Sequence, residues 1–253
     1  MVRRPGPAVT GHPLRPVAVV RVDLVVPVAS FRDPAFPGVT RCFPVPPPST
    51  VRGMLAAVTG NAAEPVPLGL SAWSEGGGID LETYHPVRAD GSNPAVGGRV
   101  RAVKGGTTIR DRPFLAGLHV TVWIPQPDGG RIASALRRPV YGLRLGRSQD
   151  LAYVCSVADV ELLPAGEAVV GHALAPVGGH ADPAALTIRL PETVTPDRLG
   201  GQSGDYLWCP EGARRQPVVG AYRDGEEAAW MLGPGGSATA CPRRRTSPVP
   251  AGP

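Results

Sequence analysis

Two short motifs near the N-terminus carry residue types that bind phosphate. Ser30-Phe31-Arg32 ends an apolar run, and Ser49-Thr50-Val51-Arg52-Gly53 directly follows prolines 46 to 48. A guanidinium binds phosphate oxygens through paired hydrogen bonds, and the free N–H groups at the start of a helix attract anions. Gly53 costs about 1 kcal/mol relative to alanine inside a helix, so it indicates either close approach of a ligand or close packing of the helix on a sheet.

Most of the other candidate cations lie in the middle of the chain. Residues 86 to 149 carry 11 basic and 3 acidic side chains, whereas residues 1 to 85 carry 7 and 6, and residues 150 to 253 carry 8 and 12. Local charge and counterion release set the affinity for a polyanion, so this segment favours a nucleic-acid partner over a basic surface without function. The candidate ligands here, with Arg41 upstream, are Arg99, Arg101, Lys104, Arg110, Arg112, Arg144 and Arg147.

Motifs of common enzyme classes are missing from the sequence. It has no P-loop, dinucleotide fingerprint, Gly-x-Ser-x-Gly or His-Glu-x-x-His, and its four cysteines lack metal-ligand spacing, so we expect neither cofactor nor metal. Metal-independent RNA cleavage needs a general base and a general acid that converge on one phosphate. Tyr84, His85, Lys104 and His119 are open as such a set, or as ordinary surface residues, because nothing in their spacing requires convergence.

A strand and a helix are expected to position the two motifs. Residues 17 to 26 alternate apolar side chains, which predicts a strand with one face on a core. Arg21 on its other face either pairs with Asp23 or meets RNA. The helix has apolar positions at helical spacing, a predicted hydroxyl N-cap at Ser49 or Thr50, and Gly60 as left-handed C-cap.

The remaining pattern predicts an α+β fold. Further strands are expected around residues 81 to 87, 117 to 124 and 152 to 163, with a short basic helix over 131 to 138. Strand, helix, strand, strand, helix, strand is typical of a ferredoxin-like (RRM-like) antiparallel sheet with helices on one face. Trp123 on the second face either stacks a base or is covered by a neighbouring element.

The expected organisation is one core with additions. Residues 88 to 112 are rich in glycine and arginine, so they form either a protruding basic thumb hairpin or a disordered loop. The chain thus divides into a flexible segment 1–16, a core 17–163 with insertion 88–112, a small β-rich C-terminal extension 164–241 and a disordered tail 242–253. The extension is acidic, which favours protein contacts or solvent. Since no apolar run approaches the roughly 20 residues of a membrane span, we expect a cytoplasmic protein without membrane contact.

Several ordered positions match one known family. Ala29-Ser30-Phe31-Arg32, then Phe43-Pro44-Val45-Pro46-Pro47-Pro48-Ser49-Thr50-Val51-Arg52-Gly53 and Leu55-Ala56-Ala57, resemble the N-terminal signature of the CRISPR-associated Cas five family. Leu143-Arg144-Leu145-Gly146-Arg147 is similar to a second, weaker family feature. These proteins belong to the RAMP superfamily and are subunits of type I surveillance complexes (Cascade) in antiviral defence.

The resemblance implies a ferredoxin-like RNA-binding core with a thumb. Such subunits cap the 5′ handle of the guide RNA (crRNA), contact the backbone and large subunits of the ribonucleoprotein, and meet target DNA through the complex. Arg32, Arg52 and the thumb arginines would hold handle phosphates, and Gly53 would allow close approach. The signature is closest to type I-B-like or related systems.

One family branch, in type I-C systems, is itself the processing endoribonuclease and uses a Tyr/Lys/His set. Here Phe43 stands where a tyrosine commonly precedes the Pro-x-Pro motif, and Gly105 follows Lys104 where that branch has histidine. We therefore predict a non-catalytic RNA-binding subunit. The alternatives are a metal-independent endoribonuclease that processes precursor crRNA and a generic ferredoxin-like protein-interaction module.

Overall fold

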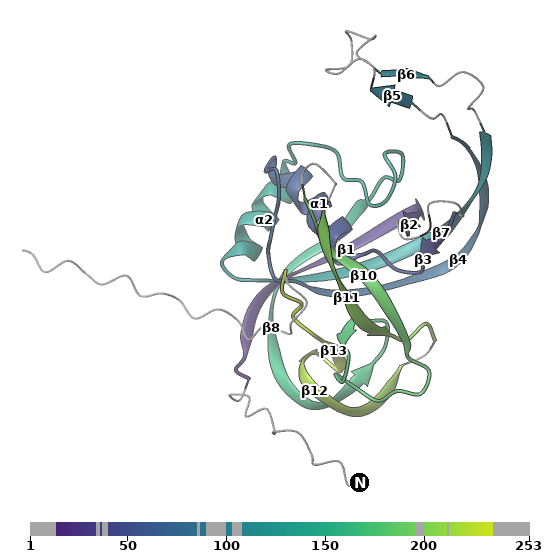
Figure 1. Ribbon diagram of the computed structural model, residues 1–253. Helices are drawn as coiled ribbons and strands as arrows, with labels where there is room; N and C mark the ends of the chain where they lie inside the picture. Colours follow the sequence, from purple (N-terminus) through teal and green to yellow (C-terminus); the bar gives the residue numbers. More distant parts are fainter. Residues whose placement is uncertain are drawn as a thin grey trace, which may run out of the picture.

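The structure is a computed structural model that describes residues 14–33, 36, 40–84, 87–89, 100–102, 108–195, 200–211 and 213–234 (Figure 1). For residues 84, 87–89, 100–102 and 108 it describes the backbone alone. The tail predicted over 242–253, and most of the N-terminal segment predicted to be flexible, lie outside the described residues.

A six-stranded sheet forms the body of the protein, with strand order β12-β13-β8-β1-β7-β4. Its four long neighbouring strands are the antiparallel set β8 (Tyr153–Val170), β1 (Val17–Ala29), β7 (Thr108–Pro125) and β4 (Gly69–Tyr84). Helix α1 (Pro48–Thr59) lies between β1 and β4 in the chain, and α2 (Asp128–Arg137) lies between β7 and β8. The coarse prediction of mixed helices and antiparallel strands is thus confirmed, although strands dominate.

Alternating residues of β1 and β7 form one apolar layer, as predicted. Val20 is paired with Ile124, Val22 with Val122 and Leu24 with Val120. All of these side chains are buried in the cluster that also holds apolar residues of both helices. Full burial of such a side chain stabilises the fold by about 1.5–3 kcal/mol relative to exposure, so this layer fixes the helices on one face of the sheet.

Strands β4 and β7 are longer than predicted. β4 begins at Gly69, and β7 begins at Thr108 within the segment expected as a hairpin. The run of glycines from 76 to 78 is typical of a turn, but here it lies inside β4. A Cβ on Gly77 would lie 2.6 Å from the carbonyl oxygen of Phe114, and one on Gly78 would lie 2.9 Å from the Phe114 ring. The glycines therefore allow β4 to pair closely with β7 beneath an aromatic ring.

Beyond the sheet, β4 and β7 continue as a two-stranded arm (Figure 1). Near its end, β5 (Val87–Ala89) and β6 (Val100–Ala102) pair as a short antiparallel ladder. Residues 90 to 99 and 103 to 107 of the predicted thumb lie outside the described part of the chain. On the arm Arg112 forms an ion pair with Glu82, with Nη1 and Oε2 3.2 Å apart, so the arm is less cationic than a count over 88–112 indicates.

The C-terminal residues complete the body of the protein. β8 runs without interruption through the boundary predicted after residue 163, and its end pairs with β12 (Arg214–Asp224) and β13 (Glu227–Ala229). A second sheet contains β10 (Leu186–Val194), β11 (Gly201–Trp208) and β9 (Ala175–Pro176), all within the segment expected to be β-rich. Short β2 (Phe31–Arg32) and β3 (Cys42–Phe43) pair beside β1.

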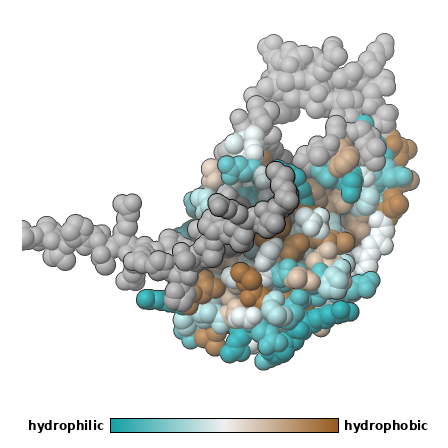
Figure 2. Space-filling view, turned by 60° about the horizontal axis from the view of Figure 1, so that its bottom comes forward, coloured by the Kyte–Doolittle hydropathy of each residue, from teal (hydrophilic) through white to brown (hydrophobic). Residues whose placement is uncertain are grey.

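The surface around β12 and β13 comes forward in Figure 2. The described residues seen there mix hydrophobic and hydrophilic side chains, with hydrophilic ones along the lower edge. In the described part of the chain, neither helix is long and apolar enough to cross a membrane.

A buried carboxylate joins the two helices. Glu64 is 4% exposed and accepts hydrogen bonds from Arg131 of α2, with Nη1 to Oε1 2.8 Å and Nη2 to Oε2 2.7 Å. Thr59 of α1 and Asn61 also donate to Oε1. Despite burial, these bonds, chiefly those from Arg131, lower the pKa of Glu64 to about 2.

We expect Glu64→Gln to lower the free energy of unfolding by about 2 kcal/mol at pH 7, because a depressed pKa stabilises the folded state above the carboxyl's unfolded value. As pH falls from about 4.5 towards 2, wild-type Glu64 becomes protonated and the difference shrinks. Urea unfolding over this pH range measures it. Asp128→Asn is the control, since Asp128 meets the same Arg131 at the surface, and such a pair contributes about 0–1 kcal/mol. Equal stability of Glu64→Gln and wild type at pH 7 would contradict the assignment.

Candidate phosphate-binding groove

A groove of about 950 Å³ opens beside the start of α1. Its walls are the first turns of α1, the loop 141–148 and residues 192–195 of β10 and the segment after it. Of the predicted site residues it collects Ser49, Thr50, Arg52, Gly53, Arg144 and Arg147. The helix motif and the second arginine motif, far apart in sequence, thus meet at one surface.

The start of α1 differs from the prediction. Pro47 is the N-cap and Pro48 the first helical residue, and no side chain caps the helix, so the predicted hydroxyl cap is wrong. Proline at the first position needs no N–H partner and has a φ suited to the helix. Ser49 and Thr50 instead lie half-buried along the groove. The first turn has no acidic residue, so the positive end of the helix dipole is not neutralised there.

Gly53 is exposed to this groove. A Cβ built at position 53 has no atom within 4 Å, so the interpretation that glycine is needed for helix and sheet packing is wrong. The missing side chain keeps the groove open next to the helix start. Close approach of a ligand is the interpretation that the geometry favours.

Arg52 lies behind the groove wall and is 5% exposed. Its Nε donates to the carbonyl of Val66 at 3.0 Å, Nη1 to that of Glu192 at 2.9 Å and Nη2 to that of Leu232 at 3.1 Å. Burial lowers its pKa. Its donors are occupied by backbone from three distant segments, so the predicted role as a phosphate ligand is replaced by a structural one.

Arg147 follows a tight turn in the second motif. Gly146 has φ +119°, and a Cβ there would lie 2.6 Å from Oδ2 of Asp150. Asp150 accepts from the backbone N of Arg147 at 2.8 Å and of Ser30 at 3.0 Å, and from Arg147 Nε at 3.1 Å. The Arg147 side chain is only 9% exposed, and its buried Nη1 forms an ion pair with Asp80 at 3.6 Å. Arg147 therefore lines the groove with its charge balanced by Asp150 and Asp80.

Ser30 and Arg112 belong to the same polar network. Ser30 is buried, and its hydroxyl donates to the carbonyl of Pro113 at 2.7 Å and accepts from Arg112 Nε at 2.9 Å. Both residues were predicted to bind RNA, but the Ser30 hydroxyl and Arg112 Nε are instead bonded to each other at the base of the arm. Their role in the described structure is to join the first motif to the arm and to the loop of Arg147.

The other predicted residues are spread over the surface and core. Phe31 is buried opposite Phe43, which corrects its prediction as an RNA ligand. Arg32 and Arg41 are exposed on β2 and beside β3, and the Arg41 guanidinium lies 4.9 Å from the centroid of the Phe36 ring. Arg144 is exposed in the groove, and no hydrogen bond or ion pair engages its guanidinium among the described residues.

Two further predicted cations belong to strands of the arm. Arg110 is half-exposed on β7, and the backbone of Arg101 lies in β6. Arg99 and Lys104 are outside the described residues. The groove therefore accounts for only part of the predicted cationic site.

Of the four candidate acid and base residues, Tyr84, His85, Lys104 and His119, only His119 has a described side chain, and it does not line the groove. Phe43 is 7% exposed, and His119 lines another pocket, with Nε2 2.8 Å from Glu75 Oε1. His85 and Lys104 lie outside the described residues.

Trp123 is covered, and its Nε1 donates to Asp224 at 2.8 Å, so the base-stacking alternative for it is wrong. Of the two alternatives given for Arg21, the structure shows the pairing with Asp23. Where side chains are described, no group of three or more His, Cys, Asp or Glu could hold a metal ion.

Sequence reasoning missed the far wall of the groove. Thr193, Val194 and Thr195 reach it because β10 packs beside α1. No local signal shows this contact, since it depends on tertiary packing between segments about 140 residues apart.

Comparison with known proteins identifies the chain. The model of the family described as CRISPR-associated protein (Cas_Cas5) matches residues 19–199. The chain belongs to the Cas5 family. This match spans both arginine motifs and residues 192–195, and therefore every wall of the groove, and it confirms the resemblance.

Solved structures of similar fold include a chain of a "CRISPR RNA-guided surveillance complex", with a TM-score of 0.50 and 20% identity over 79% of this chain and 90% of that chain. A CRISPR protein from Archaeoglobus fulgidus gives a TM-score of 0.48 and 14% identity over 84% of this chain and 97% of that one. No curated protein matches the chain. The first likeness shows that this Cas5 family member shares the fold of that subunit.

Proposed function

We propose that this Cas5 family member is a non-catalytic subunit of a cytoplasmic CRISPR surveillance complex and binds the 5′ handle of the crRNA in the groove. The observation that carries the proposal is the convergence of three features at the start of α1. They are the open space at Gly53, the first turn of α1 without an acidic residue, and the exposed Arg144.

The three features suit phosphate. An anion at a helix N-terminus is stabilised by about 0.3–1 kcal/mol, and by up to about 2 kcal/mol where it is partly buried. Hydrogen bonds from guanidinium groups add more, because both partners are charged. Tyr141, 64% exposed on the groove wall, offers a ring on which a base can stack. Backbone and base of single-stranded RNA can therefore be held together.

The fold supports the same role. The strands β1, β4, β7 and β8 lie in the sheet in the order β8-β1-β7-β4. In the chain, α1 lies between β1 and β4, and α2 lies between β7 and β8. We assign this unit as a ferredoxin-like RNA-binding core and the β4–β7 arm with β5 and β6 as its thumb. Ser30, Arg112 and Arg147 tie the thumb to the groove, so handle RNA in the groove would lie at the base of the thumb.

Partner subunits would use other surfaces. Ile79 and Leu81 of β4 and Ile109 of β7 lie on the arm and are 68%, 68% and 70% exposed. Apolar side chains gathered on an arm are typical of protein contact. We assign this surface to the backbone or large subunit of the complex.

Two observations favour a non-catalytic role. Position 43 holds a buried phenylalanine, and the described groove lining contains neither histidine nor lysine. The purified protein incubated with its cognate repeat RNA in EDTA should bind this RNA, more weakly as salt rises, and leave it intact. Cleavage that is lost in Lys104→Ala or His85→Ala would instead establish a metal-independent endoribonuclease. If the protein bound no RNA, either alone or in the complex, the result would favour a generic ferredoxin-like protein-interaction module.

A further inference from the structure

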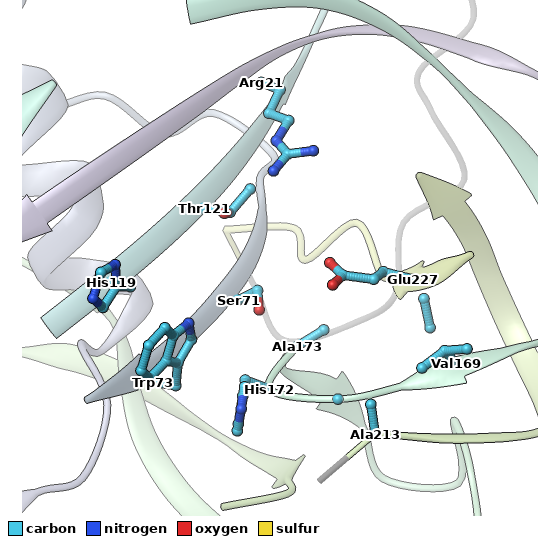
Figure 3. A pocket seen from close by; sticks show the side chains of 12 residues that line it. Arg21, Ser71, Trp73, His119, Thr121, Val169, His172, Ala173, Ala213 and Glu227 are labelled. Atoms are coloured by element: carbon cyan, nitrogen blue, oxygen red, sulfur yellow. The ribbon is translucent and has the colours of Figure 1, made fainter. Parts of the chain in front are cut away.

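A second pocket, of about 370 Å³, lies on the face of the main sheet away from the helices (Figure 3). Its floor is formed by Arg21 of β1, Ser71 of β4 and Thr121 of β7. Residues 169–173 and 227–228 lie over these strands and form the opposite side. The pocket shares no lining residue with the groove, so an inference about it stands apart from the proposed function.

One wall of this pocket is aromatic. Trp73 is 39% exposed and stacks on His119, with ring centroids 4.2 Å apart and planes 8° apart. His172 lies on the pocket side, with its centroid 6.1 Å from that of Trp73. Both imidazoles are held in place, because His119 Nε2 is 2.8 Å from Glu75 and His172 Nδ1 is 3.0 Å from the carbonyl of Cys209. Three rings thus form a fixed π surface.

The charge around the pocket is negative. Its one guanidinium, that of Arg21, is already bound by Asp23 at 3.0 Å and Asp224 at 3.1 Å. Glu227 lines the pocket, and no hydrogen bond or ion pair in the described chain engages its carboxylate, which lies toward the cavity in Figure 3. Glu75 adds a fourth carboxylate behind His119. Such surroundings repel phosphate and attract cations.

We propose that this pocket receives an arginine side chain of a protein partner. A planar guanidinium stacks on Trp and His rings and donates paired hydrogen bonds to a carboxylate, here that of Glu227. The hydroxyls of Ser71 and Thr121 can accept its remaining N–H groups. The volume lies at the lower end of the roughly 300–1,000 Å³ of small-ligand pockets, which suits one side chain better than a folded element.

The test uses the full chain and the peptide acetyl-Gly-Arg-Gly-amide as probe, followed through the indole N–H signals in NMR spectra. Trp73 is the most exposed of the four tryptophans, and Trp73→Phe assigns its signal. We expect a saturable shift of this signal, and about tenfold weaker binding of the citrulline peptide, which keeps the shape but lacks the charge. Glu227→Gln should also weaken binding of the arginine peptide by about tenfold.

Glu226→Gln is the matched control, because Glu226 is the neighbouring carboxylate but pairs with Arg215 outside the pocket. It should leave the affinity unchanged. Equal binding of the arginine and citrulline peptides, or an affinity insensitive to Glu227→Gln, overturns the proposal. A shift of the Trp73 signal by AMP but not by the arginine peptide would overturn it in favour of a nucleotide site.

Discussion

Arg52→Ala should lower the free energy of unfolding by about 3–5 kcal/mol, one of the two largest effects that we expect from a single substitution. The substitution removes the Arg52 donors from the carbonyls of Val66 and Glu192 and also creates a cavity, whereas the carbonyl of Leu232 keeps its bond from the Leu68 N–H. Each unpaired buried carbonyl costs about 1–3 kcal/mol. Urea unfolding at pH 7 measures the loss.

Arg144→Ala is the matched control for stability, because Arg144 lines the same groove but is exposed. Its effect should stay within about 0.5 kcal/mol, as is usual for surface substitutions. If Arg52→Ala were as stable as Arg144→Ala and lost RNA binding instead, Arg52 would be a phosphate ligand, and the structural role assigned to it would be wrong.

Gly53→Glu should weaken binding of the handle RNA by about 100-fold, which is the second large effect. The new side chain enters the open space of the groove and brings a negative charge to the start of α1, where a phosphate is expected. Because no atom lies within 4 Å of a Cβ at this position, the variant should fold as the wild type does. Fluorescence anisotropy with a labelled handle RNA measures the affinity.

Gly166→Glu controls for the added charge. Gly166 is exposed on β8, outside the groove, and a Cβ there also meets no atom within 4 Å. We expect its affinity for the RNA to stay within about threefold of wild type, since exposed charges farther away than a Debye length are screened. Equal losses in the two variants would show that net charge, and not the groove, governs binding.

The periodic parts of the fold could be predicted from the sequence. Alternation in β1 and helical spacing in α1 follow from burial of one face, which a linear pattern records directly. The left-handed Gly60, with φ 77°, ended the helix where it was predicted. By contrast, the glycines of β4 indicate a turn in the sequence. Their place in a strand depends on the ring of Phe114, some 36 residues away, which packs against them only in the folded protein.

The candidate site was predictable only in its residue types. A linear charge count treats Arg112 and Arg131 as free cations, but Glu82 and Glu64, which the fold brings from other segments, neutralise them. Arg52 likewise satisfies a phosphate motif in sequence, and only tertiary contacts reveal its three carbonyl partners. Arg144, from the weaker of the two motifs, is the arginine of the groove that the fold leaves exposed and without an ion pair among the described residues.

The salt dependence of RNA binding shows directly whether the groove holds handle phosphates. For a single strand, each phosphate contact contributes about 0.7 to the slope of log Kd against log salt concentration. Arg144→Gln should therefore reduce this slope by about 0.7, whereas Arg189→Gln, which removes another exposed arginine from β10 outside the groove, should leave it unchanged. Equal slopes for Arg144→Gln and the wild-type protein would contradict the account.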